Sequence, residues 1–361
     1  MINNKTIAVV VPAYNEEVQI GMVIETMPEF VDRIVVVNDC SKDKTAEVIK
    51  TYQNKYFSDT KLEKNEVAKT IYSRADEIVE ELSKQETEFF PPAEIHQVKP
   101  NDKVVLINLL INNGVGGAIA RGYKWCKDNN IDCTAVMAGD GQMDPSELYS
   151  ICEPVVYENI DYVKGNRLSH KSAKKLIPRS RFRGNSILSI LTKIASGYWH
   201  ISDTQTGYTA ISNVALNKIE LYKIYKRYGM PNDMLVKLNI ESCTLREVPI
   251  KPIYYIGEQS KMKIGNVIPR ISKLLILSFF KRIWRRYFLK SFHPLFILYH
   301  MGFLMLTASI PFGIKILSRV FENMDANPVT VLAFAFLFFS GFQSLLFAMW
   351  MDIQDNERLN K

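Results

Sequence analysis

Cysteine is sparse in this chain of 361 residues, and its five thiols are scattered along it. None forms a Cys-x-x-Cys pair, and no histidine stands at the spacing of a metal ligand. This pattern excludes a disulfide framework and a zinc site, and it predicts reduced thiols in the cytosol. The first apolar run, residues 7–11, is too short for the core of a secretory signal, so we expect no signal peptide.

The sequence also has neither a zinc-finger pattern nor the stacked aromatics of a nucleic-acid-binding surface, so we expect no nucleic acid as partner. Its net charge is +7, from 45 Lys and Arg against 38 Asp and Glu. Five of these cations lie between Lys281 and Lys290, next to the most apolar part of the chain. That position indicates a lipid bilayer with anionic headgroups as the partner.

Two almost uncharged runs, residues 294–317 and 329–351, follow this basic cluster. Each exceeds the roughly 20 residues needed to cross the hydrocarbon of a bilayer. We therefore expect a transmembrane hairpin over residues 293–351, although a pair of core helices in a soluble protein would look similar. The cations precede the first span, so the positive-inside rule places the large domain and the tail, residues 352–361, at the cytoplasmic face of the cell (inner) membrane.

Residues 261–292 have the pattern of an amphipathic helix at the membrane surface. The side chains of Leu277, Phe280, Trp284 and Tyr287 fall at helical spacing on one face. The cations Lys281, Arg282, Arg285 and Arg286 lie away from that face. We expect the apolar face to contact lipid and the cations to lie beside the headgroups.

The first 260 residues predict an α/β domain with a mainly parallel sheet. Apolar runs of strand length begin near residues 6, 33 and 103, and each is followed by polar turn residues and a helical pattern. Between them, residues 52–102 are rich in Lys and Glu. We interpret this segment as a solvated helical insertion at the rim of the sheet, with a partner-binding arm as the alternative.

The stretch of residues 134–147 runs as a strand, breaks at Gly139-Asp140-Gly141 and reopens as a helix at Pro145. Asp140 therefore lies at the carboxyl end of a strand, where open α/β sheets bind their ligands. With Gln142 and Asp144 close behind it, several oxygens can converge on a divalent cation that holds a diphosphate. The alternative is a turn in which Asp and Gly serve only their own backbone.

Further polar segments suit phosphate or proton chemistry. Residues 112–118 form a glycine cluster before a helix, which allows close approach of a phosphate, although the spacing fits neither the Walker A pattern nor the dinucleotide fingerprint. Arg167, Arg181 and Arg183 can clamp phosphate oxygens or form an ordinary basic surface. Asp203 lies in a loop of hydroxyl residues, and Asp233 either caps a helix or points into a cleft.

In this order the motifs resemble the family-2 glycosyltransferases of the GT-A fold. Within them they resemble the polyprenyl-phosphate glycosyltransferases related to dolichyl-phosphate mannose synthase. The resemblance covers residues 6 to about 260 outside the 52–102 segment, and its motifs are residues 11–16, 38–43, 112–118, 139–142, 165–167 and 203–207. Membrane-anchored members also have C-terminal spans. An oligomer is compatible with all of this.

The resemblance implies a site for a nucleotide-sugar donor. The pocket for its base and ribose would be lined by Pro12, Tyr14, Glu16 and Asp39, with Asn112 and Gly114 close by. Asp140 would be the last acid of the family's Asp-x-Asp signature and, with Gln142, would bind Mg²⁺ or Mn²⁺. The chain departs from the family at Ala138, where the first acid is expected. Mg²⁺ tolerates this because it keeps several waters and uses one or two carboxylates.

The implied reaction is inverting transfer of the sugar to a polyprenyl (undecaprenyl or dolichyl) phosphate, whose phosphate Arg167, Arg181 and Arg183 would hold. A hydroxyl acceptor would instead need a base, for which Asp203 and Asp233 are the candidates. One alternative function is extension of a lipid-linked glycan or polysaccharide, although a processive synthase is disfavoured by the missing QxxRW-type motif. Another is a silent nucleotide-binding scaffold, suggested by Ala138. The sugar, and the choice between UDP and GDP, stay open.

Overall fold

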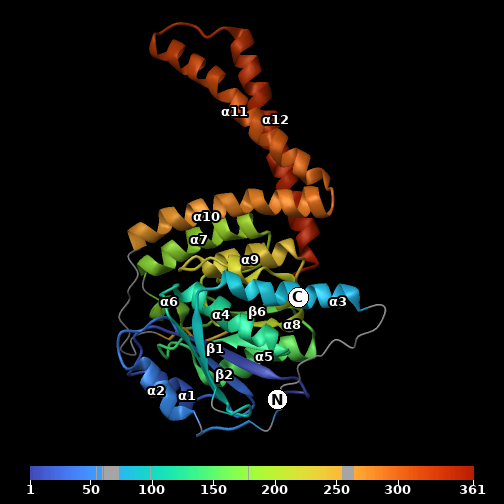
Figure 1. Cartoon of the computed structure of the whole chain (residues 1–361). Helices are drawn as coiled ribbons and strands as arrows, with labels where there is room; N and C mark the ends of the chain where they lie inside the picture. Colours follow the sequence, from blue (N-terminus) through green and yellow to red (C-terminus); the bar gives the residue numbers. More distant parts are fainter. Residues whose placement is uncertain (54, 59, 61–72, 98, 178, 254–263) are drawn as a thin grey trace.

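A mixed eight-stranded sheet lies at the centre of the N-terminal domain in this computed structural model (Figure 1). The structure describes the chain except residues 54, 59, 61–72, 98, 178 and 254–263, and except the side chains of residues 174, 179–187 and 264–268. In the described part the strand order is β3-β4-β2-β1-β5-β7-β6-β8. The strands are β1 Ile7–Ala13, β2 Arg33–Asn38, β3 Ala93–His96, β4 Val104–Leu109, β5 Cys133–Val136, β6 Tyr162–Asn166, β7 Thr209–Ser212 and β8 Leu245–Pro249.

The predicted parallel sheet is present, with two exceptions. The central strands β4, β2, β1 and β5 run parallel in register, as in the pairing of Val10 with Val35, and their side chains are almost all buried. Continuous Val and Ile runs suit strands covered on both faces. The strands β3 and β7 are antiparallel to their neighbours. The strand β3 lies in the segment that we read as a helical insertion, so part of that segment extends the sheet.

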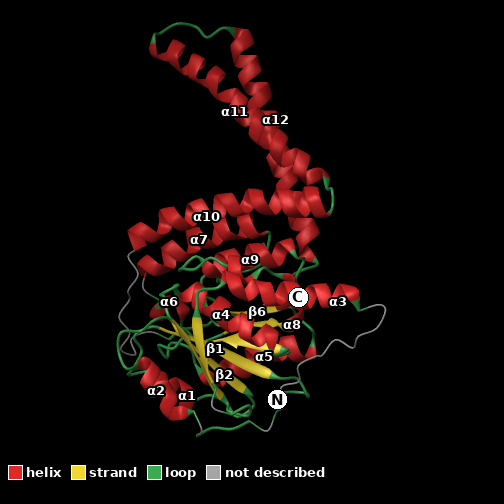
Figure 2. Ribbon diagram, viewed as in Figure 1, coloured by secondary structure: helices red, strands yellow, loops and turns green. Residues whose placement is uncertain are grey.

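Helices cover both faces of the sheet (Figure 2). On one face the core is shared with α4 (Val115–Asp128), α8 (Asn213–Lys218) and α9 (Met230–Ile240). On the other face it is shared with α1 (Ile20–Glu25), α2 (Thr45–Tyr52) and α5 (Leu148–Tyr157). Because the sheet is sandwiched in this way, open space for a ligand lies at its edges, where loops leave the strands.

The charged 52–102 segment also contains α3 (Arg74–Glu86) and a short 3-10 turn at Thr87–Phe89. In the sequence Val67, Ile71, Ala75, Ile78 and Leu82 are spaced as one helix face, of which Val67 and Ile71 lie outside the described residues. Ala75 is exposed, and Ile78 and Leu82 are 41% and 58% exposed. The described helix is therefore solvated along this face, and its contact with the domain is polar, through the ion pair of Glu86 with Lys127 on α4.

Three further helices form the C-terminal part. The long helix α10 (Ile264–Trp284) lies along α7 (Arg179–Ser196), and a π-helical turn at Arg285–Lys290 leads to α11 (Pro294–Phe321). The last helix α12 (Pro328–Glu357) returns antiparallel to α11, so that the hairpin projects away from the domain (Figure 1).

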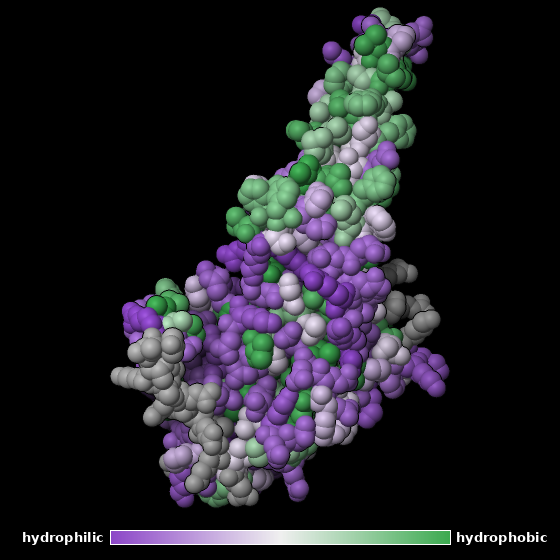
Figure 3. Space-filling view, turned by 90° about the vertical axis from the view of Figure 1, so that its right-hand side faces the viewer, coloured by the Kyte–Doolittle hydropathy of each residue, from purple (hydrophilic) through white to green (hydrophobic). Residues whose placement is uncertain are grey.

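Both hairpin helices are long and apolar enough to span a membrane. Only 22% and 11% of their most apolar windows are buried, whereas the core helices of a soluble protein are mostly buried. Figure 3 shows a predominantly hydrophobic surface on the hairpin above a predominantly hydrophilic domain.

The amphipathic pattern of α10 was only partly predicted. Leu277, Phe280 and Trp284 are exposed as expected, together with Ile276. The expectation for Tyr287 was wrong, because it is 2% exposed and faces the protein. Two of the five clustered cations were also placed wrongly. Arg282 and Arg286 are 0% and 4% exposed, since carboxylates near the end of α12 bind them inside the protein; the other three, Lys281, Arg285 and Lys290, are exposed.

Candidate active site

The candidate site is the sheet edge at which β1, β2, β4, β5, β6 and β8 all end, since these six strands are parallel to one another. Hydrogen bonds hold the loops after neighbouring strands together. The amide of Gly139 donates to the carbonyl of Pro12 at 3.3 Å, and the amide of Asp39 donates to that of Ala13 at 2.9 Å. The edge therefore brings the loops that carry Pro12, Asp39 and Asp140 next to one another.

The loops after β1 and β2 are tied together by side chains. The amide of Asn15 donates to Ser41 Oγ at 3.0 Å, and Asn15 Oδ1 accepts from the amide of Lys42 at 2.9 Å. The amide of Glu16 donates to Thr45 Oγ1 at 2.9 Å. Tyr14 and Glu16 are half-buried in this connection. The structure thus places both residues beside the Asp39 loop, where the resemblance implies a base and ribose pocket.

Asp39 joins the β2 loop to the glycine loop before α4. Its side-chain Oδ1 accepts the amide of Asn113 at 2.6 Å, and its carbonyl accepts Nδ2 of Asn112 at 3.1 Å. Burial raises the pKa of Asp39, although hydrogen bonds from the amides of Asn113 and Gly114 oppose the rise. Gly114 has a φ of 75°, which only glycine adopts without strain. Asp39, Asn112 and Gly114 are therefore assembled as one unit.

Asp140 is half-buried in the turn after β5, where its Oδ1 accepts the amide of Gln142 at 3.0 Å. The carboxylate and the Gln142 amide oxygen are hard donors, so this turn fits Mg²⁺ or Mn²⁺ with one protein carboxylate. Asp144 is differently used, because it accepts the amide of Ser146 at 2.9 Å and pairs with Lys251 at 2.9 Å. Among the described residues no group of three or more His, Cys, Asp or Glu side chains is placed to hold a metal.

Arg167 and Asp203 meet at the end of β6. Arg167 Nε and Nη2 donate to the two carboxylate oxygens at 2.8 and 3.0 Å, and the Arg167 amide adds a third bond at 3.1 Å. Asp203 is 1% exposed, whereas the Arg167 side chain is 23% exposed. Burial alone would raise the pKa of Asp203, but the adjacent guanidinium outweighs it and lowers the pKa. This carboxylate is a weak base and an orienting partner for the guanidinium.

A polar cluster that contacts this pair was not predicted from the sequence; it contains the half-buried Glu247 and the buried Lys164. Glu247 on β8 accepts the amides of Ser202 and Asp203, each at 2.9 Å, and Nδ2 of Asn166 at 2.8 Å. Lys164 on β6 is fully buried and donates to the carbonyl of Thr206. Burial lowers the pKa of Lys164 to about 8, although Asp203 opposes this. The signal was the presence of charged residues within strands, Lys164 in β6 and Glu247, beside Arg246, in β8.

The remaining predicted residues are not joined to this pair by the contacts described. Asp233 lies in the first turn of α9, where it accepts the amide of Tyr225 at 2.9 Å and pairs with Lys237. Asp233 thus binds the loop that precedes α9, and the N-cap residue Gly229 makes no side-chain capping hydrogen bond. Arg181 and Arg183 belong to α7, but their side chains lie outside the described part of the structure. Their roles, like those of the other site residues, stay predictions.

Comparison with known proteins identifies the class. The chain matches the model of Glycosyl transferase family 2 over residues 8–69 and 77–220, which is more than half of its length. The protein is therefore a glycosyltransferase, and it belongs to that family. The match also runs through most of the 52–102 segment.

Named relatives act on lipid phosphates. The chain is 29% identical over 266 residues to a UDP-N-acetylglucosamine–dolichyl-phosphate N-acetylglucosaminyltransferase of Methanococcus voltae, covering 73% of this chain and 92% of the relative. It is 25% identical over 292 residues to a dolichyl-phosphate beta-glucosyltransferase of Trichomonas vaginalis, covering 77% and 74%. A solved glucosyl-3-phosphoglycerate synthase of Mycobacterium tuberculosis, in complex with Mn²⁺ and UDP, aligns with a TM-score of 0.48 at 16% identity, covering 77% and 80%.

Proposed function

We propose that this glycosyltransferase moves a sugar from a nucleoside-diphosphate sugar to a polyprenyl phosphate at the membrane surface, with inversion at the anomeric carbon. Two findings support a lipid acceptor. Relatives of this chain carry the names of dolichyl-phosphate glycosyltransferases. The site edge also belongs to a domain attached to two helices long enough to span a bilayer. A soluble donor and a membrane-bound acceptor would meet at this edge.

The observation that carries the choice of acceptor is the bond between Asp203 and Arg167. A hydroxyl acceptor needs a base to take its proton. Asp203 is buried, both of its carboxylate oxygens accept hydrogen bonds from Arg167, and its pKa is lowered. It is therefore a poor base for deprotonating a hydroxyl. A phosphate monoester is already ionised near neutral pH and needs little base. The pair therefore suits a phosphate acceptor, with Arg167 as its cationic partner and Asp203 as the orienting group.

In the proposed reaction a phosphate oxygen of the acceptor attacks the anomeric carbon, and the bond from that carbon to the donor diphosphate breaks. No proton has to be transferred, so positioning dominates the rate enhancement. Pro12, Tyr14, Glu16 and Asp39 would line the nucleotide pocket, and Arg167 would hold the acceptor phosphate. A divalent cation held by Asp140 and Gln142 would supply electrostatic stabilisation of the leaving diphosphate.

We further propose that the domain and the C-terminus lie on the cytoplasmic side. Both the start of α11 and the end of α12 are at the domain end of the hairpin (Figure 1). If α11 crosses the bilayer and α12 returns, the domain and the C-terminus lie on the same side. The exposed side chains Ile276, Leu277, Phe280 and Trp284 on α10 would rest in the interface. The exposed cations Lys281 on α10 and Arg285 in the turn that follows it would lie beside the headgroups.

The test is an acceptor comparison with the full-length protein in vesicles. Radiolabelled UDP- and GDP-sugars are supplied with polyprenyl phosphate, with the matching polyprenol, or with a lipid-linked glycan. We expect label in polyprenyl phosphate only. Label in polyprenol or in the glycan, without label in polyprenyl phosphate, would support the glycan-extending alternative. Donor binding without turnover would support the scaffold.

A further inference from the structure

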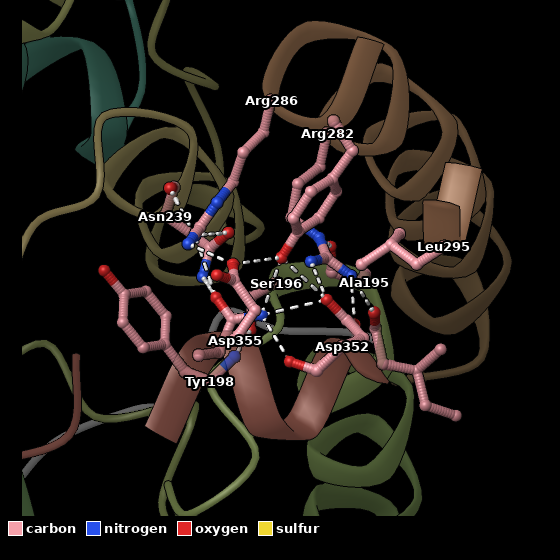
Figure 4. Close-up of polar contacts among 12 residues, drawn as sticks. Ala195, Ser196, Tyr198, Asn239, Arg282, Arg286, Leu295, Asp352 and Asp355 are labelled. Atoms are coloured by element: carbon pink, nitrogen blue, oxygen red, sulfur yellow. Dashed lines mark hydrogen bonds and ion pairs between the residues drawn. The ribbon is translucent and has the colours of Figure 1, made fainter. Parts of the chain in front are cut away.

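The end of the membrane hairpin is bound inside the catalytic domain by a buried network of charged residues (Figure 4). Arg282 on α10 and Asp352 on α12 are both 0% exposed, and the guanidinium donates to the two carboxylate oxygens at 2.7 and 2.8 Å. Tyr287 and Asn356 also donate to Asp352, at 3.0 and 2.9 Å. Because these hydrogen bonds are directional, the network defines the rotation of α12 about its axis and its position along that axis.

The same arginine reaches the helix that leads to the site. Arg282 Nε donates to the carbonyl of Ala195 at 2.9 Å, and Nη2 donates to that of Ile194 at 3.1 Å, both at the end of α7. Although burial alone would lower it, the pKa of Arg282 is raised because Asp352 binds the charged form. Arg282 therefore joins α7, α10 and α12 at one point.

A second arginine repeats the arrangement one turn further along. Arg286 donates to the carbonyl and side-chain oxygens of Asn239 on α9, at 2.8 and 2.6 Å. It also donates to Asn356 and Asp355 on α12, each at 2.8 Å. Arg282 near the end of α10 and Arg286 in the π-helical turn after it thus bind two successive turns of α12. A rotation of α12, or a slip by one residue, which is about 1.5 Å along the axis, would break these bonds.

The tail beyond α12 is bound as well. The amide of Leu245 donates to the carbonyl of Leu359 at 2.7 Å, and the amide of Lys361 donates to the carbonyl of Leu245 at 2.9 Å. The last residues therefore lie parallel to β8 at the sheet edge, and the side chain of Leu359 is buried in the core. The hairpin is fixed to the domain at its entry through α10 and at its exit through the tail.

A continuous path of contacts leads from this network to the Arg167–Asp203 pair. Thr192, less than one turn before Ile194 on α7, donates to Asn232 on α9 at 2.9 Å. The side-chain Nε2 of Gln205 donates to Asn232 Oδ1 at 2.9 Å, and the backbone amide of Gln205 donates to Asp203 Oδ1 at 3.2 Å. These contacts hold the Arg167–Asp203 pair at a fixed place relative to α7 and α9, the helices to which Arg282 and Arg286 bind the hairpin.

We propose that Arg282 and Asp352 are positioning residues, which hold the membrane hairpin in one orientation so that an acceptor phosphate in the bilayer meets Arg167. This inference rests on the proposed function. A buried ion pair is a poor means of stabilising a fold compared with apolar side chains, and in some proteins buried polar groups are instead retained because they specify one geometry. A tether alone would need no such network, whereas a site that must lie at a set depth and angle to the bilayer does.

The test replaces the pair by apolar side chains, Arg282→Met with Asp352→Leu, in the full-length protein in nanodiscs. This double variant leaves neither charge alone in the core. Transfer is measured to a long-chain polyprenyl phosphate in the bilayer and to a short-chain, water-soluble prenyl phosphate. We expect the ratio of the two kcat/KM values to fall by at least about tenfold, because a small misplacement of reacting groups costs that much or more. Activity with the short acceptor should stay within about twofold, which a general loss of folding would not allow.

Two further proteins make the result decisive. Arg358→Gln removes an exposed ion pair to Asp355 on the same segment and should leave the ratio unchanged. Asp352→Asn keeps the shape of the side chain and should also lower the ratio. It serves as the test if the double variant fails to fold. An unchanged ratio in Asp352→Asn or in the double variant would overturn the proposal.

A distance measurement separates this inference from the proposed function. Spin labels are attached through Glu322→Cys at the hairpin tip and Glu153→Cys on the exposed side of α5, in a Cys40→Ser background. We expect a narrow distance distribution in the parent protein and a broad one in the double variant. An equally narrow distribution in both would overturn the proposal even if the parent protein transferred sugar to neither acceptor, a result that would by itself refute only the proposed function.

Discussion

Asp203 accepts two side-chain hydrogen bonds from Arg167, from Nε at 2.8 Å and from Nη2 at 3.0 Å. The pair lies where the loop after β6 meets the loop before β7. Because Asp203 is buried while Arg167 is partly exposed, the carboxylate orients the guanidinium and does not itself face solvent. This relation supports the proposal of a phosphate acceptor over a hydroxyl acceptor.

Replacing the orienting carboxylate should therefore affect the acceptor more than the donor. In Asp203→Asn we expect KM for polyprenyl phosphate to rise by about tenfold or more, corresponding to about 1.4 kcal/mol of lost binding. The Kd for the nucleotide should change little. Steady-state kinetics together with calorimetric titration of UDP or GDP measures both. Equal losses in donor and acceptor binding would mean that Asp203 has a purely structural role.

The same pair should make stability depend on acid. The pKa of Asp203 is lowered from 3.8 in the folded protein, so its contribution to stability is present above pH 3.8 and is lost as the pH falls below it. Thermal unfolding in detergent should show a smaller difference between the parent protein and Asp203→Asn at acid pH than at neutral pH. A difference that is constant with pH would contradict the buried ion pair.

Lys164 predicts that stability rises with pH in the alkaline range as well. Burial lowers its pKa from 10.5 to about 8, so between these values the folded protein holds fewer protons than the unfolded chain. Its contribution to stability therefore rises as the pH increases from 8 to 10.5, and it is constant below pH 8. Lys164→Met should lack this rise. Unfolding curves of the two proteins across that range test it, and parallel pH profiles would refute it.

Gly114 gives a test of the glycine loop. Its φ of 75° strains any other residue, and an added Cβ would press against the carbonyl oxygen of Lys226. Gly114→Ala should cost about 1–3 kcal/mol of stability and weaken nucleotide binding. Gly207→Ala is the matched control, because the added carbon there would be 3.6 Å from Met143 Cε, an ordinary contact. Similar thermal shifts in the two variants would argue against a strained loop at Gly114.

Asp140→Asn tests the cation site. Loss of the carboxylate should reduce transfer by at least about a hundredfold, since charge stabilisation in a site contributes several kcal/mol. The unfolding temperature should stay near that of the parent protein. Nucleotide binding should no longer be strengthened by Mn²⁺, a readout that does not depend on turnover. Full activity, or unchanged Mn²⁺ dependence, would remove Asp140 from the metal role.

The fold could be predicted well because its signals are local. Runs such as residues 6–12 and 33–38 have both the length and the apolar character of buried parallel strands. The family was recognised from short motifs in a fixed order, and the family match confirms it. The antiparallel strand β3 was missed because Ala93-Glu-Ile-His96 is only four residues long. Its alternation of polar and apolar residues is the pattern of an edge strand.

The site was predicted as a set of residues, but its contacts were not. Nothing local to Arg167 indicates that it binds Asp203, 36 positions away. Arg282 and Arg286 look like surface cations in the sequence, because their partners Asp352 and Asp355 follow some 70 residues later, beyond two apolar helices. Buried ion pairs depend on tertiary packing, so periodicity gives the face of a helix but not what covers it.

The central claim is transfer of the sugar alone to a lipid phosphate. The most direct measurement uses a donor labelled with ¹⁴C in the sugar and ³²P in the phosphate next to it, incubated with the full-length protein and polyprenyl phosphate in vesicles. We predict a lipid product that contains ¹⁴C and no ³²P, with all ³²P in the released nucleoside diphosphate. A lipid that carries both labels, or a ¹⁴C product that contains no lipid phosphate, would contradict the account.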